Sequence, residues 1–335
     1  MTTMTSRNRA PLQHRATSSL AALALCAAAL MSNAQAAPCP ASNFDDFFKT
    51  LQDRPEIRMN HVRKPLTLQW VEMQGDLPHV KNSAASDPGR ELQGVFALQK
   101  SKGLKATVER PDRVILRDEN GESLVILVFE QKNCWTLNRI EDWSLGQQLY
   151  TTSAADPAAI AIKRGDLYIR IAGETPSNSL IALYASALDN YLYGASLGSA
   201  KAAYAAAGIS LSGQAPQLPT PRMQNLLETA AKTIPEAGIT LAYFYCDEGE
   251  SGSNLPCANP DKALQALKDI ARLDLKTALV ELGNAYATGN IAAPNTSQAL
   301  ACFLEAQSMG ATGLDNTIEN LKAKGSIAQS AAHCL

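Results

Sequence analysis

The sequence has few of the residues on which metal binding, nucleic-acid binding and membrane insertion depend. Histidine occurs 4 times in 335 residues, and no two cysteines have the spacing of a zinc motif. No stretch after residue 36 reaches the ~18 apolar residues of a membrane span. Basic residues form no stripe and do not alternate with aromatic ones. We therefore expect no metal, no cofactor, no nucleic-acid partner and no stable membrane insertion.

Residues 1–36 have the three parts of a secretory signal peptide. A basic head, a short apolar core and a cleavage motif follow one another: Arg7, Arg9 and Arg15, then Leu20–Met31, then Ala34-Gln35-Ala36. The apolar core is too short to span a membrane. Leu25 precedes Cys26, where a lipoprotein signal needs a small residue. We expect export and release, with the mature protein in the periplasm.

Removal of this segment changes both the charge and the cysteine count. It contains three arginines and no acid, so the formal charge moves from −2 to about −5. Seven cysteines become six, and an even number in an exported chain favours disulfides. Closeness in sequence predicts Cys246–Cys257 and Cys302–Cys334, which leaves Cys39 with Cys134. Several buried free thiols are the alternative.

Residues 37–150 predict an α+β domain. Phe44, Phe47, Phe48 and Leu51 predict a helix over 43–53, and alternation predicts a strand over 66–70. The polar stretch 76–92 is expected to be a loop. Two apolar runs, 114–116 and 124–129, flank Asn120-Gly121 and predict a hairpin. A last strand is expected over 134–143, which completes a curved antiparallel sheet.

This part of the chain resembles NTF2-like domains over about 100 residues. The resemblance depends on Phe44-x2-Phe47-Phe48, the strand start Pro65-Leu66 and the late strand with Trp135 and Ile140. It implies either a small-molecule pocket or a plain binding platform. For an enzyme, Asp142 and His61 are the nearest acid and base candidates, but solvation at the surface explains each more simply. Trp70, Trp135 and Trp143 are expected to be core residues.

Residues 151–160 predict a linker, and an alanine-rich part with a repeated pattern follows over 161–335. Ala237-x3-Leu241-Ala242-x2-Tyr245 recurs as Ala278-x3-Leu282-Gly283-x2-Tyr286, and each is followed by a second apolar run. Further units begin near Ala200 and Ala161. Periods of 35–41 residues with two helices per unit predict a helical solenoid.

These units resemble the Sel1-like repeat family, relatives of the tetratricopeptide repeats, over roughly 160–315. The match is clearest at 278–310, from Ala278-x3-Leu282-Gly283 to Glu305-Ala306-x3-Gly310. The resemblance implies a scaffold for protein contact whose first helices line the binding face. It points to Tyr243, Phe244, Glu281 and Asn284 as contact residues. The loop between Cys246 and Cys257 begins with Asp247, Glu248 and Glu250, and these acidic residues are expected to contact a partner as well.

One motif points to catalysis. Gly194-Ala195-Ser196-Leu197-Gly198 matches G-x-S-x-G, the nucleophile elbow of α/β-hydrolases. The elbow requires a preceding strand, whereas 179–193 has helical periodicity. Ser196-Leu197-Gly198 also recurs as Ser308-Met309-Gly310, which predicts a turn between helices.

The sequence as a whole predicts an exported, non-catalytic protein that binds another protein. An immunity or inhibitor protein against a toxic enzyme and an adaptor in the cell envelope are two versions of this hypothesis. A small-molecule-binding NTF2-like domain with a repeat scaffold is the first alternative. A serine hydrolase that uses Ser196 is the second.

Overall fold

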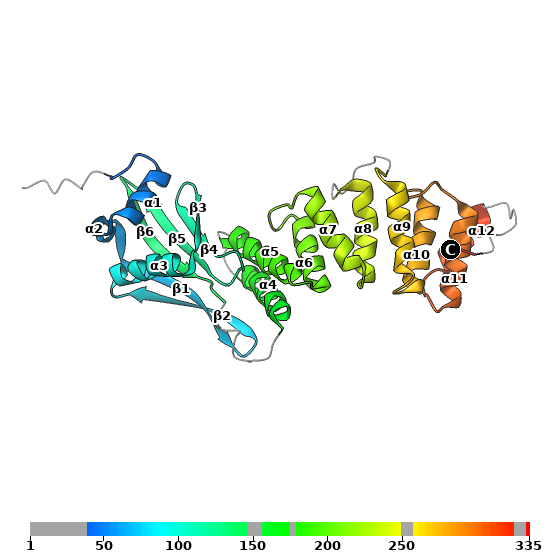
Figure 1. Cartoon of the computed structure of the whole chain (residues 1–335), viewed down its shortest axis with the longest axis horizontal. Helices are drawn as coiled ribbons and strands as arrows, with labels where there is room; N and C mark the ends of the chain where they lie inside the picture. Colours follow the sequence, from blue (N-terminus) through cyan, green and yellow to red (C-terminus); the bar gives the residue numbers. More distant parts are fainter. Residues whose placement is uncertain (1–38, 146–155, 175–178, 249–256, 325–332) are drawn as a thin grey trace, which may run out of the picture. The chain divides into compact units, whose positions relative to one another are not determined.

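A computed structural model of the chain describes residues 39–145, 156–174, 179–248, 257–324 and 333–335. A part with a β-sheet comes first, and a series of helices follows it (Figure 1). The elements of the first part are α1 Phe44–Asp53, α2 Pro55–Arg58, η1 Met59–His61, β1 Val62–Gln74, β2 Leu77–Ala85, α3 Pro88–Lys102, β3 Lys105–Glu109, β4 Arg113–Arg117, β5 Leu124–Gln131 and β6 Trp135–Asp142.

Within the described residues, the six strands form one sheet in the order β2-β1-β6-β5-β4-β3. The predicted helix at 43–53 and the hairpin formed by β4 and β5 are both present. The expected antiparallel sheet is wrong in one pairing, because β1 runs parallel to β6. Hairpins enforce antiparallel pairing only between strands that are consecutive in sequence, and these two strands are far apart in the chain.

The expected loop at 76–92 is also wrong, because this stretch contains β2 and the start of α3. β2 is an edge strand, which explains why it is polar and accommodates Pro78. Asp87 accepts a hydrogen bond from the backbone N–H of Arg90, and Pro88 occupies the first turn of α3. Both residues favour the start of a helix at this point.

The two faces of the sheet pack against different helices. Leu68, Ile140 and Val125 share one face by their register, and they lie beneath α3. α1 packs beside α3 through Phe48 and Phe96, whose ring centroids are 6.2 Å apart. On the other face, residues such as Ile126 belong to the same hydrophobic core as the first two helices that follow the sheet.

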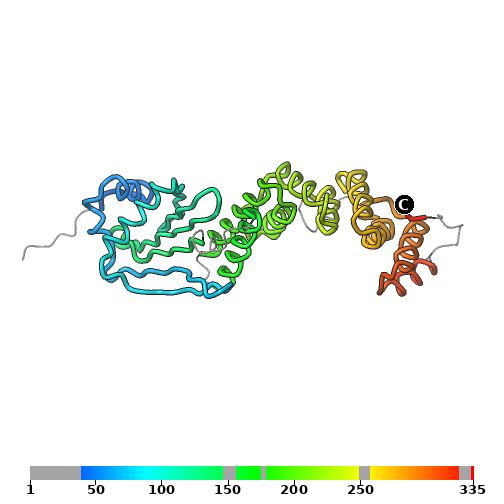
Figure 2. Tube along the Cα trace, turned by 60° about the horizontal axis from the view of Figure 1, so that its bottom comes forward, coloured from blue at the N-terminus to red at the C-terminus, as the bar shows by residue number. Residues whose placement is uncertain are grey.

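Among the described residues, the helical part contains four consecutive helix pairs and one further helix. The trace of these helices can be followed by colour from green to red in Figure 2. The pairs are α4 Pro157–Glu174 with α5 Leu180–Ser196, α6 Ala200–Leu211 with α7 Thr220–Ala231, α8 Pro235–Asp247 with α9 Pro260–Ile270, and α10 Leu275–Thr288 with α11 Thr296–Ser308; α12 is Asp315–Lys324. The predicted helical repeats are therefore present. α4 begins four residues before the expected start at 161.

The two helices of a pair can approach each other closely where the first helix has a glycine. A Cβ atom added to Gly283 on α10 would lie 2.7 Å from the ring of Phe303 on α11. Gly165 on α4 has the same relation to the ring of Tyr191 on α5. An aromatic ring of the second helix thus packs on the backbone of the first, which explains the small residues in the repeated pattern.

Buried polar groups join the sheet to α4 and α5. Arg164 on α4 is 1% exposed and donates to Asn190 Oδ1 and Glu122 Oε1, both at 2.8 Å. Asn190 donates in turn to the carbonyl oxygen of Gly121 at the β4–β5 turn. Glu141 on β6 is also buried and accepts from the hydroxyl group of Ser179 at 2.6 Å. Each of these charges has a partner, as burial requires.

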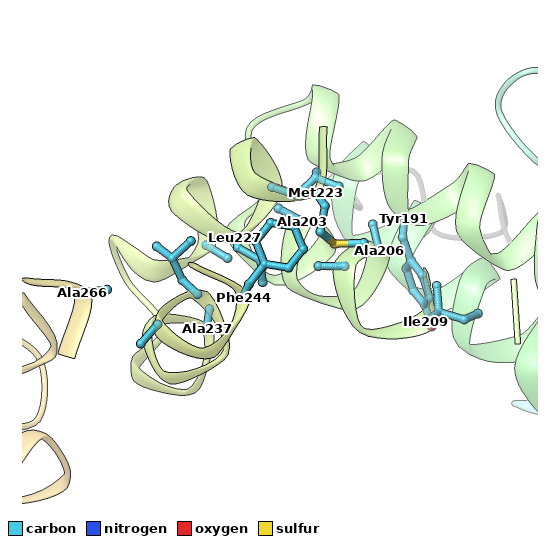
Figure 3. Packing of buried hydrophobic residues seen from close by; sticks show 14 of the residues in the cluster. Tyr191, Ala203, Ala206, Ile209, Met223, Leu227, Ala237, Phe244 and Ala266 are labelled. Atoms are coloured by element: carbon cyan, nitrogen blue, oxygen red, sulfur yellow. The ribbon is translucent and has the colours of Figure 1, made fainter. Parts of the chain in front are cut away.

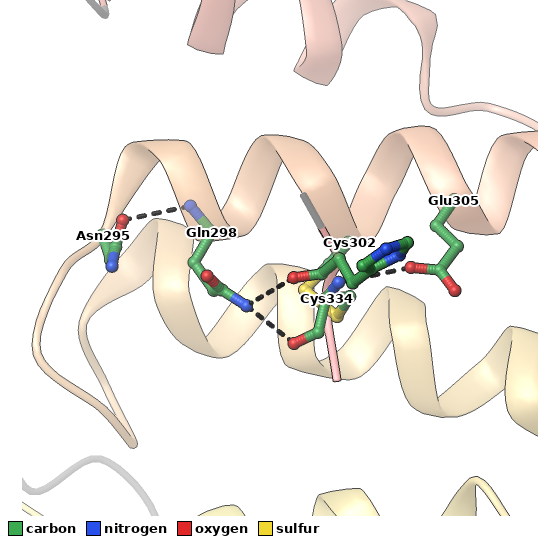
Figure 4. Close-up of a disulfide and its surroundings, with 6 residues drawn as sticks. Asn295, Gln298, Cys302, Glu305 and Cys334 are labelled. Carbon is green, nitrogen blue, oxygen red and sulfur yellow. Dashed lines mark hydrogen bonds between the residues drawn. A yellow bond between two sulfur atoms is a disulfide. The ribbon is translucent and has the colours of Figure 1, made fainter. Parts of the chain in front are cut away.

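Two disulfides lie in the helical part, at the predicted pairs. Cys246 is bonded to Cys257, and Cys302 to Cys334. Cys39 and Cys134 are disulfide-bonded as well. The bond to Cys302 on α11 holds residues 333–335, and Gln298 donates to the carbonyl oxygens of His333 and Cys334 (Figure 4).

Candidate functional site

The exposed sides of the first helices α8 and α10 form the surface that the sequence predicts as a binding site. We call this surface the first-helix face. On α8 its residues are Glu236, Thr240, Tyr243 and Asp247, which recur every three or four positions. Tyr243 is 42% exposed, which is unusual for an aromatic residue in this chain. Residues such as Ala237, Ala242 and Phe244 on other sides of α8 are buried in the core.

Tyr243 and Glu281 interact across the two neighbouring first helices. Burial raises the pKa of the Glu281 carboxyl group, and a hydrogen bond with Asn284 partly opposes this rise. Burial also raises the pKa of Tyr243, and the negative charge of Glu281 adds to the effect. No lysine or arginine in the described part of the chain offsets the shift of Glu281. The structure therefore brings Tyr243, Glu281 and Asn284 together.

This arrangement has a definite chemical preference. A half-buried carboxylate without a cationic neighbour gains most from a donor that carries positive charge. An exposed tyrosine ring beside it favours the same kind of group through cation–π attraction. A lysine or arginine side chain of another molecule would satisfy both groups at once.

The acidic residues at the end of α8 have separate positions. Asp247 is the last residue of α8 and is half-buried, and Glu248 follows it and is exposed. Glu248 has a φ angle of 50° in the left-handed region and closes the helix with a hydrogen bond from its N–H to the carbonyl oxygen of Phe244. Glu250 lies outside the described residues.

Phe244 does not belong to the candidate site. It is 4% exposed and belongs to the hydrophobic core that also contains Leu227 and Ala203 (Figure 3). Its position directly after Tyr243 explains the correction, because consecutive residues on a helix point about 100° apart. Here one of the two neighbours faces the core and the other faces solvent.

Two further features belong to this face and were not predicted. Tyr204 on α6 lies 3.4 Å from the hydroxyl oxygen of Thr240, which extends the face by one helix pair. Glu248 occupies the position of Gly289 in the next unit, since both follow the repeated tyrosine by three residues. Gly289 has the same left-handed backbone, with a φ of 77°. Comparing the two units position by position would have revealed this replacement.

A pocket of about 300 Å³ lies between α3 and the sheet. Apolar residues such as Leu68, Val95 and Ile140 line it, together with Trp70 and Asp142. Trp70 is half-buried there, and Asp142 accepts a hydrogen bond from the backbone N–H of Ser144 at 3.0 Å.

The other aromatic and acid–base candidates of this part lie in the core. Trp135 and Trp143 are buried, as expected. His61 is also buried rather than solvated, and its Nδ1 atom lies 3.2 Å from the carbonyl oxygen of Trp135. It is not among the residues that line the pocket.

Ser196 lacks the geometry of a catalytic nucleophile. It is the last residue of the helix α5, so no strand precedes it, and its hydroxyl group donates to the carbonyl oxygen of Tyr193 at 2.7 Å. Gly198 and Gly310 follow their helices with φ angles of 89° and 86°, which supports the interpretation of both motifs as turns. Within the described residues, no group of three or more histidine, cysteine or acidic side chains could hold a metal ion.

No protein-family model matches the sequence, and no curated protein sequence matches it. Two solved structures similar to this chain are Sel1 repeat proteins. One is a Sel1 repeat protein from Oxalobacter formigenes, with a TM-score of 0.41 and 21% identity over 53% of this chain and 70% of that chain. The other is c5321, a protective antigen present in uropathogenic Escherichia coli strains displaying an SLR fold. Its TM-score is 0.41, with 19% identity over 53% of this chain and 36% of that chain.

Proposed function

We propose that this chain is an exported, non-catalytic scaffold that binds a basic surface of another protein through the first-helix face. The observation that carries this proposal is the pair formed by the exposed ring of Tyr243 and the half-buried carboxylate of Glu281. An arginine or lysine side chain of the partner would lie over the ring and bond to the carboxylate. Tyr204 and Glu248 would extend the contact on either side.

Binding of a cation at this point changes the state of Glu281 in a defined direction. A positive neighbour stabilises the charged carboxylate, so binding lowers its raised pKa. By linkage, the affinity for the basic partner rises as the pH increases up to the raised pKa that Glu281 has in the free protein. Above that pKa the affinity is constant. Affinity also falls with added salt, because the contact is partly exposed.

The N-terminal pattern and the disulfides support export to an oxidising compartment such as the periplasm. No helix within the described ranges is long and apolar enough to cross a membrane. Two versions of the proposal differ in the partner. An immunity or inhibitor protein would bind a toxic enzyme and block its activity, whereas an envelope adaptor would bind a structural partner without inhibition.

A pull-down from a periplasmic extract with a matched pair of variants tests the proposal. We expect the wild-type chain to retain a stoichiometric protein that Tyr243→Ala with Glu281→Gln releases. Glu319→Gln is the control, because it neutralises an exposed acid on α12, away from the face. Retention of the same protein by the double variant would contradict the proposed face. A bound small ligand with no protein partner would contradict the proposed function.

The pocket under α3 favours a second candidate function, the binding of a small apolar molecule in an NTF2-like part. Its volume of about 300 Å³ is at the lower end of the range for ligand pockets. Native mass spectrometry of the purified chain tests this candidate. A co-purified ligand that disappears in Val95→Trp, which fills the pocket, would support it. The same added mass above the bare chain in both proteins, or no added mass in either, would refute it.

A further inference from the structure

A groove of about 470 Å³ opens on the side of α8 that lies opposite the first-helix face. Its floor is formed by Gly238, Leu241 and Tyr245 of α8. The second helices α7 and α9 form its walls, with Ala231 and Ala266 among the wall residues. We call it the second-helix groove.

The floor of the groove differs from the next unit at one position of the repeated pattern. Ala237 on α8 corresponds to Ala278 on α10, so Gly238 corresponds to Leu279, which is fully buried. Gly238 has no side chain, and Ile270 lies directly on its backbone, 2.7 Å from where a Cβ would stand. Ile270 of α9 thus fills at Gly238 the space that a leucine side chain fills in the next unit, and both residues belong to the lining of the groove.

The acidic groups of the groove already have partners within it. The hydroxyl group of Tyr245 donates to Glu228 at 2.8 Å, and burial together with this bond raises the pKa of Tyr245 to about 12. The phenol therefore stays protonated and remains a donor. Asp269 forms a salt bridge with Arg272 at 3.2 Å and accepts from Gln265 at 3.0 Å.

Two lysines of the groove have no acidic partner among the residues that the structure describes. Lys262 lies in the first turn of α9, with its Nζ atom 5.6 Å from the centre of the Tyr245 ring. Lys232 follows the C-terminal end of α7, as Arg272 follows that of α9. Lys262 and Arg272 are ten residues apart, which corresponds to about 15 Å along a helix axis. Positive groups thus lie near both ends of an apolar floor.

We propose that the second-helix groove binds an extended acidic peptide segment of a partner protein. An apolar side chain of the peptide lies on Leu241 and Ile270, one carboxylate reaches Lys262, and the other reaches Lys232 at the opposite end. An extended peptide advances about 3.3 Å per residue, so carboxylates four residues apart are about 13 Å apart. The ligand class is therefore an acidic residue, a spacer, an apolar residue, a spacer and a second acidic residue.

Charge complementarity selects this occupant over the alternatives. A basic segment would meet unpaired ammonium groups at both ends, and a purely apolar segment would leave them without a counter-charge. The site differs from the first-helix face in both its position on α8 and the sign of its charge. The two sites would therefore recognise different partner sequences.

The test uses the full chain and a fluorescein-labelled pentapeptide, Asp-Ala-Leu-Ala-Asp, with binding measured by fluorescence polarisation. We expect saturable binding that weakens by about tenfold in Lys232→Glu with Lys262→Glu. Lys322→Glu, which makes half of that charge change on the exposed side of α12, should bind like wild type. The peptides Asn-Ala-Leu-Ala-Asn and Asp-Ala-Gly-Ala-Asp should each bind more weakly than the original.

Three outcomes would overturn the proposal. The first is equal binding by the double lysine variant and the wild type, or no binding of the probe at all. The second is binding of decanoate without binding of the peptide, which would assign the groove to a small amphiphile. The third is self-association of the chain that the double lysine variant abolishes, which would assign it to a second copy. The Tyr243→Ala with Glu281→Gln variant should retain the probe, which separates this test from that of the first-helix face.

Discussion

Replacing Arg164 by methionine should destabilise the whole chain, although no binding surface contains this residue. Its guanidinium group is 1% exposed and bonds to Asn190 and Glu122, so it links α4, α5 and the β4–β5 turn. Methionine keeps most of the length of the side chain and removes both hydrogen bonds. The variant therefore tests the polar link between the sheet and the helices without opening a large cavity.

The size of the expected loss in the free energy of unfolding follows from Asn190 and Glu122, the two groups that lose a hydrogen-bond donor. Asn190 is fully buried, so its side-chain carbonyl is left without a donor at a cost of about 1–3 kcal/mol. Glu122 loses a charged hydrogen bond worth about 1.5–3 kcal/mol, but its side chain is 26% exposed and water recovers part of this. We expect the free energy of unfolding to fall by about 3 kcal/mol, the lower end of the range for broken buried ion pairs.

Urea unfolding followed by circular dichroism measures this change, and a double-mutant cycle with Glu122→Gln isolates the ionic part. The two substitutions should couple by about 1.5 kcal/mol or more, because they remove the same bond. Coupling near zero would show that the Arg164–Glu122 pair contributes nothing. A loss below about 1 kcal/mol in the Arg164 variant would refute the assignment of a structural role to this network.

Three further predictions concern single elements of the helical part. Replacing Cys302 and Cys334 by alanine opens a loop of 32 residues and should lower the free energy of unfolding by about 3.7 kcal/mol in urea; an unchanged midpoint would contradict this. Glu248→Gly should raise it by about 0.5 kcal/mol, because glycine adopts the left-handed backbone freely; a lower melting temperature would be the contrary result. Asp274→Ala should cost about 1 kcal/mol at neutral pH, because Asp274 caps α10. Hydrogen bonds from Thr277 lower the pKa of Asp274 from 3.8 in the folded state, so this contribution is present above about pH 4 and is lost as the pH falls below it. An equal loss of stability in Asp274→Ala and in the wild type between pH 7 and pH 3 would contradict that assignment.

Local patterns predicted the elements whose residues alternate between core and solvent. The helix α1 follows from the spacing of Phe44, Phe47 and Leu51, and the hairpin follows from Asn120-Gly121 between two apolar runs. β2 was missed because an edge strand needs few apolar residues, and the start of α3 was missed because it lies in the same polar stretch. The signals for α3, Asp87 followed by Pro88, were present and short. The parallel pairing of β1 with β6 joins distant segments, so no local pattern contains it.

The candidate site divides in the same way. Tyr243, Glu281 and Asn284 could be predicted because the phase of the repeat places them between the buried motif positions. Phe244 could not be distinguished from Tyr243 without knowing which side of α8 faces the core. The second-helix groove depends on how α9 packs on Gly238, and a glycine in a sequence does not reveal what packs around it.

The two ends of the helix series are closed by different structures. At the first end, one face of the sheet shares a core with α4 and α5. At the last end, α12 buries Ile318 and Leu321, and a disulfide holds residues 333–335 against α11. An open array of repeats exposes apolar helix sides at its ends and can grow by stacking one molecule on another. The sheet and the α12 segment cover apolar sides of the neighbouring helices, so those sides are not open to stacking of this kind.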